Sequence, residues 1–526
     1  MSKSLLSFVW VAGPLSGLIM QPVVGVWSDK CVSQFGRRRP FMVVGSLIVG
    51  LSLMLMAWTR EFVDIFVWSE RWAPTVTICF AVLSVFFADF AVNAVQACCR
   101  AIIVDTLPKS KQEMANAWAG RMVAGGHLVG YFAGVINLVE YFPYLGNNQL
   151  KVLCAISSFA LLVCVGLTSW AVEERVMTLT DEADKSNSLY HILRTLLHTG
   201  FHLPRRIRQI FMVQVFAWYG WFTFLFYAST WVGYIYVRYD SADLKDSTDI
   251  VGDIGRVGSL ALTFYSTVTL ICSLILPFCI SSPNSDKAHY QPSSGPFSAY
   301  RPTLPTAWMV GEIVYAFAMF CTFFVRSVRG ATFIVAICGF SWSLTSWAPF
   351  SLLAEEIRKL NVSRNTDGYQ SLSTEDDDRV EPADTERSIE TPRKSRQIVG
   401  QDREDLAGAT PITDGLDPLS AIDSTVTEDL AELSSSSSLD QNSEEEESSE
   451  QAGIYLGLHN VSITLPQFVS TFISFIVFSL IDPGQSNELT GGDSVSGVDS
   501  IGVTLRIGAL TALASAYMAN QLRQFN

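Results

Sequence analysis

The chain has 526 residues, of which 49% are hydrophobic and only 16% charged. Soluble proteins carry about 25% charged residues, so this composition excludes an ordinary soluble protein of this length. The net charge of −14 belongs to one segment, because residues 361–450 contain 24 Asp and Glu against 7 Lys and Arg. The rest of the chain is nearly neutral, and we expect no nucleic-acid partner.

Apolar runs long enough to cross a hydrocarbon core of about 30 Å recur along the chain. A backbone in lipid must satisfy its own hydrogen bonds, so these runs predict helices. We therefore expect an all-α integral membrane protein in contact with the lipid bilayer. About eleven spans are predicted, at 5–27, 40–58, 74–104, 120–140, 151–172, 207–236, 258–280, 305–325, 331–354, 453–481 and 501–519.

Basic residues predict the orientation of the spans. Loops 28–39, 105–119 and 173–206 are rich in Lys and Arg, which places them in the cytoplasm by the positive-inside bias. The loop 482–500 has four acidic residues and no basic residue, so it is expected outside. The short turn around Arg326 runs against this pattern. We expect a multi-pass protein of the plasma membrane rather than the vacuolar membrane.

Five predicted spans precede the loop 173–206 and six follow it. Transporters built from paired repeats usually have equal halves, so we infer that an expected first helix is missing. The predicted parts are an N-terminal transmembrane half (1–172), a central cytoplasmic loop (173–206), the first part of the C-terminal half (207–354), an acidic Ser-rich cytoplasmic loop (355–452) and the last two spans (453–526).

The acidic segment 361–450 is too polar to bury the apolar surface that folding requires. We expect it to be disordered. Its many Ser and Thr residues predict a kinase as a partner, and an unregulated spacer is the alternative.

The first motif, GVWSDKCVSQFGRRRPF, runs from Gly25 to Phe41 and joins two predicted spans. Gly25 is expected to permit close helix approach. Asp29, Gly36 and the three arginines are predicted gating or structural residues, with Asp29 pairing with basic groups at the membrane interface and the arginines reaching toward it. A simple topology signal is the alternative for the arginines, which are Arg37, Arg38 and Arg39.

The second motif places four polar side chains on one face of the span at 74–104. Asp89, Asn93, Gln96 and Arg100 follow each other at helical spacing, and ionisable groups inside a membrane usually face a cavity. Asp89 and Arg100 are about 16 Å apart along the axis, too far for a direct pair on this helix. A polar network that ties helices together is the alternative. Asp105, at the predicted cytoplasmic end, is expected to pair with Arg121.

Together these motifs resemble the sucrose or α-glucoside:proton symporters, a family of glycoside–cation symporters in the major facilitator superfamily, and the fungal members in particular. The resemblance covers most of the chain except 361–450. It implies a two-half helical bundle, of whose usual twelve spans the first is missing here. It also implies that Asp89 carries the proton and that Arg100 binds sugar hydroxyls or stabilises ionised Asp89.

Further residues fit the same family. Predicted sugar-binding residues, beside Arg100, Asn93 and Gln96, are Gln214, Trp218, Asn460 and Gln467, since aromatic rings stack on sugars and amides bond hydroxyls. An interfacial aromatic belt is the alternative for some of the rings. Arg256, which matches an arginine of the family, is expected to form an outer gate with Asp253.

The resulting hypothesis is proton-coupled import of sucrose or a related α-glucoside by alternating access. Two alternatives are a membrane sugar sensor that signals through the acidic loop and a truncated, non-functional carrier. We expect no enzyme, cofactor or metal site, because no catalytic triad, phosphate-binding loop or metal-ligand spacing stands out.

Overall fold

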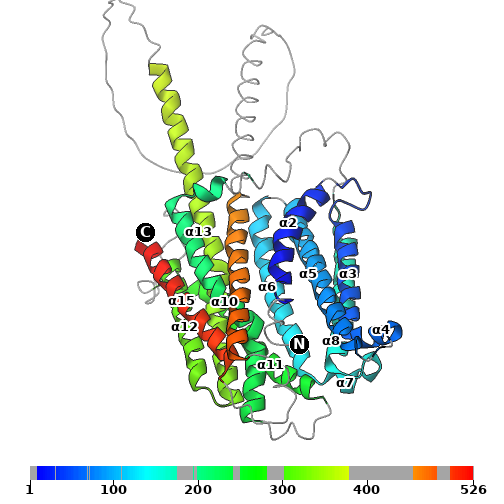
Figure 1. The fold of residues 1–526 in the computed structure, drawn as a ribbon. Coiled ribbons are helices and arrows are strands. Elements are labelled where there is room, and N and C mark those ends of the chain that lie inside the picture. Colours follow the sequence, from blue (N-terminus) through cyan, green and yellow to red (C-terminus); the bar gives the residue numbers. More distant parts are fainter. Residues whose placement is uncertain are drawn as a thin grey trace, which may run out of the picture. The chain divides into compact units, whose positions relative to one another are not determined.

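The computed structural model describes eleven stretches of the chain, shown as ribbon in Figure 1. They are residues 9–29, 31–67, 69, 71–107, 109–174, 194, 198–240, 249–280, 301–377, 454–482 and 498–524. These residues form helices and turns, with no extended strand among them. The all-α membrane fold predicted from the sequence is therefore confirmed. The segment 361–450, expected to be disordered, is helical over 361–377, where α13 (Val328–Asp377) continues into it, so that expectation is wrong there. Residues 378–453 and most of the loop 173–206 lie outside the described residues.

The described part of the chain contains nine helices that are long and apolar enough to cross a membrane. They match nine of the eleven predicted spans. Two further helices, α2 (Ala12–Asp29) and α6 (Lys109–Val135), coincide with the other two. Their mean hydropathy is lower because of residues such as Gln21 in α2 and Arg121 and His127 in α6.

A first group of helices follows the chain from its start. α3 and α2 pack against α5, and α8 packs against α3. Their apolar core includes Val24, Met42, Val95 and Val165. Besides α2 and α6, the group contains α3 (Arg39–Ala57), α4 (Thr59–Phe66), α5 (Ala73–Thr106), α7 (Leu138–Tyr141), the short 3₁₀ helix η1 (Pro143–Leu145) and α8 (Gln149–Ala171).

A second group of helices packs around α10. α15 contacts both α10 and α12, and α11 also lies against α10. A Cβ atom added to Gly220 of α10 would lie only 2.8 Å from the carbonyl oxygen of Gly508 in α15, so this helix crossing requires glycine. The group contains α10 (Arg205–Tyr239), α11 (Ile250–Cys279), α12 (Leu304–Cys321), η5 (Thr322–Phe324), α13 (Val328–Asp377), the Ile454–Ile481 helix and α15 (Ser500–Gln524).

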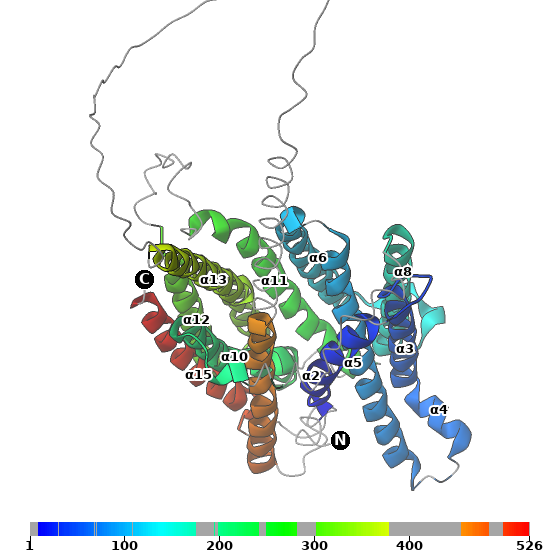
Figure 2. The same cartoon turned by 90° about the horizontal axis from the view of Figure 1, so that it is seen from above.

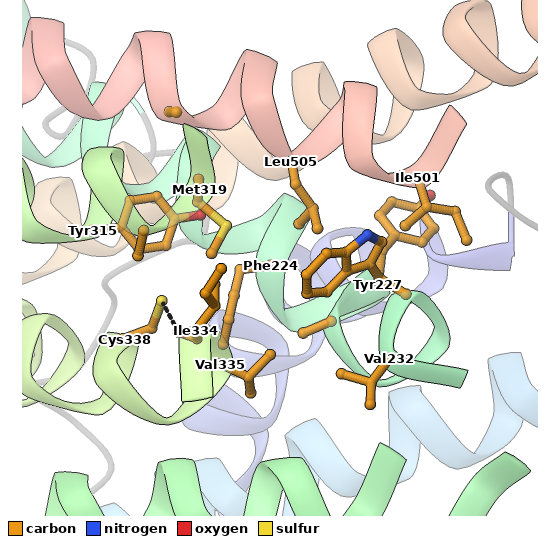
Figure 3. Packing of buried hydrophobic residues seen from close by; sticks show 14 of the residues in the cluster. Phe224, Tyr227, Val232, Tyr315, Met319, Ile334, Val335, Cys338, Ile501 and Leu505 are labelled. Carbon is orange, nitrogen blue, oxygen red and sulfur yellow. Dashed lines mark hydrogen bonds between the residues drawn. The ribbon is translucent and has the colours of Figure 1, made fainter. Parts of the chain in front are cut away.

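The core of the second group is rich in aromatic rings. Figure 3 shows Phe224, Tyr227 and Tyr315 packed among Met319, Leu505 and other apolar side chains. Edge-to-face contacts, as between Tyr227 and Phe478 at 5.2 Å, add to the stability that burial provides. Dense packing of this kind restricts the movement of the polar side chains that lie within the second group.

Polar side chains set the starts of two helices. The Asn148 side chain accepts a hydrogen bond from the Lys151 amide (2.9 Å) before α8, and Asp249 accepts one from the Gly252 amide (2.9 Å) before α11. Such caps satisfy amides that have no partner within the helix. Many large apolar side chains remain exposed, including Phe159, Trp170 and Phe317. That much exposed apolar surface indicates contact with lipid.

The two groups meet along α6 and α11, which lie side by side in Figure 2. The contact involves small side chains, because a Cβ on Gly134 of α6 would lie within 3 Å of the Ser259 side chain in α11. A second contact stacks Trp10 on Phe226 of α10, with ring centroids 4.7 Å apart. Gln467, in the Ile454–Ile481 helix, reaches to within 3.1 Å of the Cβ position of Gly13 in α2.

Candidate functional site

The polar face predicted on α5 is present. The Asn93 amide donates to the Ser16 hydroxyl (2.8 Å), and the Gln21 amide donates to the Asn93 oxygen (3.4 Å). Asn93 also donates to the backbone oxygen of Asp89 (3.0 Å). These bonds tie α2 to α5. The structure therefore gives Asn93 a role in helix packing, beside the sugar-binding role that the sequence predicts.

Asp89 is half-buried in α5, among largely apolar residues. No hydrogen bond or ion pair joins its carboxylate to another side chain in the part of the chain described. Further along the same face Arg100 and Gln96 are exposed, and the Arg100 guanidinium donates to the Gln96 oxygen (3.4 Å). Asp89 and Arg100 do not pair, as expected from their spacing. The face thus offers an isolated carboxylate at one depth and two exposed hydrogen-bonding groups at another.

The second group of helices contributes an aromatic surface. Trp218 of α10 and Trp342 of α13 are both half-buried and meet edge to face, with centroids 5.6 Å apart. Phe222 also packs against Trp218, with ring centroids 5.2 Å apart. The buried indole nitrogen of Trp218 has no hydrogen-bond partner within the described chain. The half-buried rings of Trp218 and Trp342 suit the apolar face of a sugar.

The three predicted amide ligands of this group lie in different surroundings. Gln214 is fully buried, and its amide nitrogen lies 2.9 Å from Nε2 of the buried His459. Gln214 thus joins α10 to the Ile454–Ile481 helix. Asn460 is exposed, and Gln467 is half-buried beside Gly13. Of the three, Gln214 is already bonded within the protein, which its helical position alone did not indicate.

Glu312 is a polar residue that the sequence analysis missed. It lies in α12, is 0% exposed, and accepts hydrogen bonds at Oε1 from the Thr345 hydroxyl (2.9 Å) and the Trp308 indole (3.2 Å). A signal was available, because Glu312 is the one carboxylate in the predicted span 305–325. Intramembrane carboxylates of this kind are costly and are usually functional.

The motif between α2 and α3 forms an ionic network with the ends of α5 and α8. Asp105 accepts from Arg37 (2.6 Å) and from Nε of Arg38 (3.0 Å). Arg38 also bonds the Ser28 hydroxyl and the Gly25 carbonyl oxygen (3.3 Å). The predicted Asp105–Arg121 pair is therefore wrong, since Arg37 and Arg38 take the carboxylate and Arg121 lies over the Trp118 ring.

Glu174, just beyond α8, holds the start of α3. Its carboxylate accepts from the backbone amides of Arg38 (2.8 Å) and Arg39 (3.1 Å). Gly36 turns the chain beside it with φ of +100°, a conformation that favours glycine. A Cβ on Gly25 would meet no atom of the described residues within 4 Å, which contradicts the predicted close helix approach there. The side chain of Asp29 lies outside the described residues.

At the other end of the helices, Asp253 and Arg256, the residues predicted to form an outer gate, make an ion pair within α11. The Arg256 guanidinium also lies 3.5 Å from the Asn137 side-chain oxygen, just after α6. Arg256 therefore contacts the first group of helices from the second. Its role as a gate stays a prediction.

Comparison with known proteins identifies the family. The sequence profile of the Major Facilitator Superfamily matches residues 1–366. The chain belongs to this superfamily. The two groups of helices are accordingly the two halves of a major facilitator bundle. The crystal structure of the nucleoside transporter NupG shares this fold, with a TM-score of 0.52, 9% identity and coverage of 99% of this chain and 91% of that one.

Curated relatives within the superfamily agree with the resemblance seen in the motifs. The general alpha-glucoside permease of Schizosaccharomyces pombe is 27% identical, over 100% of this chain and 88% of its own length. The sucrose transport protein SUT5 of Oryza sativa subsp. indica is 26% identical over 52% of this chain. That alignment spans about half (54%) of the rice protein.

In this major facilitator bundle, several contacts between the halves lie toward the predicted outer end. They include the Arg256 guanidinium with the Asn137 side-chain oxygen (3.5 Å) and the backbone N–H of Gln149 with the Asp249 carboxylate (3.5 Å). At the predicted cytoplasmic end, the Arg38–Asp105 pair joins helices of the first half. The Arg206–Glu356 pair (3.0 Å) joins helices of the second half.

Proposed function

We propose that this chain is a secondary active transporter that imports sucrose or a related α-glucoside together with protons, by alternating access. The similarity to an alpha-glucoside permease along the whole chain supports the substrate class. The observation that carries the coupling is Asp89, a half-buried carboxylate without a partner in the described residues.

An ionised carboxylate in an apolar setting is costly unless a cation or several donors compensate it. Asp89 has neither among the described residues, so binding a proton relieves this cost. A proton from the outer side neutralises Asp89 and favours the sugar-bound carrier, and loss of the proton inside lets the empty carrier return. Movement of one half against the other about a central site would carry both ligands.

The sugar has complementary groups available in both halves. Arg100 and Gln96 are exposed on α5 and can bond hydroxyls, while Trp218 and Trp342 present aromatic faces from α10 and α13. The contacts Asn137–Arg256 and Gln149–Asp249 support an arrangement closed at the predicted outer end. In the mechanism proposed, these contacts must break for sugar to enter from outside.

The test is uptake of labelled sucrose and maltose in a transport-deficient host, at acidic and neutral outside pH, with and without a protonophore. Surface expression must be confirmed. Uptake that rises at acid pH and collapses with the protonophore is expected. Uptake that is independent of pH and protonophore would refute the coupling, and no uptake of any glucoside by surface-expressed protein would refute the proposed transport.

The sensor hypothesis makes a different prediction. Deleting residues 361–450, which carry the acidic run, should leave transport intact if the chain is a carrier. A sensor would instead lose its signalling output, with no net sugar flux in either form.

A further inference from the structure

Glu312 lies inside the packed core of the C-terminal half and has no place in the mechanism described so far. Its side chain is 0% exposed. Oε1 accepts two hydrogen bonds, from Thr345 and Trp308, whereas Oε2 is buried and has no hydrogen-bond partner among the described residues. Within the described residues, Oε1 is therefore fully hydrogen-bonded, whereas Oε2 makes no hydrogen bond.

The bonds around Glu312 connect three helices. The Trp221 indole of α10 donates to the Thr345 hydroxyl of α13 (3.3 Å), and this hydroxyl donates to Glu312 of α12. Thr345 also lies 3.1 Å from the Ser341 carbonyl oxygen one turn earlier, which offers its single hydrogen an alternative acceptor. A hydroxyl with two possible acceptors can respond to a change of charge on Glu312 by changing its partner.

Among the described residues, no cation contacts this carboxyl group. The neighbouring Tyr315 uses its hydroxyl to donate to the Gly220 carbonyl oxygen (2.6 Å). Arg506 of α15 lies beyond the C-terminal end of α12, where it contacts Thr322 (3.5 Å) and the Phe323 ring. Other titratable groups near Tyr315 include Tyr219 of α10, Tyr265 of α11 and Cys338 of α13.

A buried charge without a counter-ion costs several kcal/mol, more than two neutral donors on one oxygen return. The arrangement described is therefore the one expected for a neutral, protonated Glu312. Ionisation would require a further donor or water at Oε2, and the packing around it leaves that atom buried. Gain and loss of a proton must then be accompanied by a shift of α13 or α10 relative to α12.

Such a shift would reach the aromatic surface. Trp221 packs against Trp342 with centroids 4.9 Å apart, and Trp342 in turn contacts Trp218. The ring that bonds Thr345 thus touches the rings that are available to a sugar. A chain of contacts thus connects the carboxyl group to the aromatic surface: Glu312 bonds Thr345, Thr345 bonds Trp221, and Trp221 packs on Trp342.

We propose that Glu312 is a second proton site, in the C-terminal half, whose protonation sets the affinity of the Trp218–Trp342 surface for sugar. This inference rests on the proposed function. Protonated Glu312 keeps Thr345 and Trp221 in the positions described and gives the high-affinity form. Loss of the proton disturbs this line of contacts and lowers affinity, so sugar is released more readily on the less acidic side.

The decisive experiment measures sugar exchange in proteoliposomes carrying Asp89→Asn, in which coupling through Asp89 is removed. We expect the KM for sugar to rise by several-fold from acid to neutral pH in this variant, up to a limit of tenfold per pH unit for one proton. The double variant Asp89→Asn/Glu312→Gln, whose amide imitates the protonated acid, should keep the low KM at every pH. As a control, Glu173→Gln at an exposed glutamate replaces Glu312→Gln in the double variant. The KM of this control should depend on pH as it does in Asp89→Asn alone.

Two results would overturn the inference: a KM that is already independent of pH in Asp89→Asn, or one that stays pH-dependent in the double variant. A second measurement needs neither transport nor coupling. Infrared difference spectra of the purified protein between acid and alkaline pH should contain a carboxylic-acid band that Glu312→Gln removes and Glu312→Asp retains at a shifted position.

If the band remains in Glu312→Gln, no proton titrates at Glu312 and the inference is wrong. If the band behaves as expected while wild-type uptake is insensitive to pH and protonophore, the proposed proton-coupled function fails but the proton site stands. The two failures are thus distinguishable.

Discussion

Asp105 offers a quantitative test of the ionic network at the start of α3. Asp105→Asn keeps the size of the side chain but removes the charge that Arg37 and Arg38 share. Arg38 is affected more than Arg37, because the Arg38 side chain is only 8% exposed whereas that of Arg37 is 23% exposed. The remaining acceptors of Arg38 include the Ser28 hydroxyl and the Gly25 carbonyl oxygen, both neutral.

The expected cost follows from this burial. Removing one partner of a fully buried ion pair costs about 3–5 kcal/mol, because the other charge is left uncompensated. The two neutral acceptors and the exposure of Arg37 reduce this figure, so we expect about 2–3 kcal/mol. Reversible unfolding of the purified protein in mixed detergent micelles would measure the change.

Glu61→Gln is the matched control. Glu61 pairs with Lys151, whose side chain is as buried as that of Arg38 (8% exposed in each case), but the Glu61 carboxylate is 51% exposed, against 18% for Asp105. Water therefore screens this pair, and its loss should cost about 1 kcal/mol, less than the loss of Asp105. Equal losses of unfolding free energy in the two variants would refute the argument that burial sets the strength of the network. So would full recovery of Asp105→Asn stability in high salt, which screens exposed charges and leaves buried ones nearly unaffected.

Three further predictions concern coupling, sugar affinity and pH. Asp89→Asn should abolish protonophore-sensitive accumulation while sugar exchange down a gradient survives, measured as counterflow; retained accumulation would rule out the proton role of Asp89. Trp218→Ala should raise the KM for sugar by about fivefold, because a stacked ring contributes on the order of 1 kcal/mol; an unchanged KM would exclude stacking at this ring. The hydrogen bond from Lys151 lowers the pKa of Glu61, which lies outside the spans, below its ordinary value of 4.5. The pair therefore stabilises the fold above about pH 4.5 and ceases to do so as pH falls through the lowered pKa, so the unfolding free energies of wild type and Glu61→Gln should converge in acid and differ at neutral pH.

The sequence predicted helices and faces better than it predicted neighbours. The polar face of α5 follows from helical spacing alone, and the structure has it. Helical spacing also put Gln214 and Trp218 on one face of α10. It could not show that His459, 245 residues later, covers Gln214 while Trp218 stays half-exposed. Which helix covers a face depends on tertiary packing, which a single sequence does not reveal.

The errors have the same origin. Asp105 was expected to pair with Arg121, an arginine near it in the chain, whereas Arg37 and Arg38 reach it from the start of α3. Glycine at position 25 was taken as a sign of close packing, yet Gly220 has that role. Glu312 was overlooked because the family motifs lie elsewhere, although a lone carboxylate in an apolar span was visible in the sequence.

The contact between α6 and α11 has a mechanical consequence. Gly134 and Ser259 let the two helices approach closely near the predicted outer end. α6 has 27 residues, which corresponds to a length of about 40 Å. If α6 rotated by about 10° around this contact, its predicted cytoplasmic end would move by roughly 7 Å. A tilt small enough to preserve most contacts at one end could thus open or shut a passage for a disaccharide at the other.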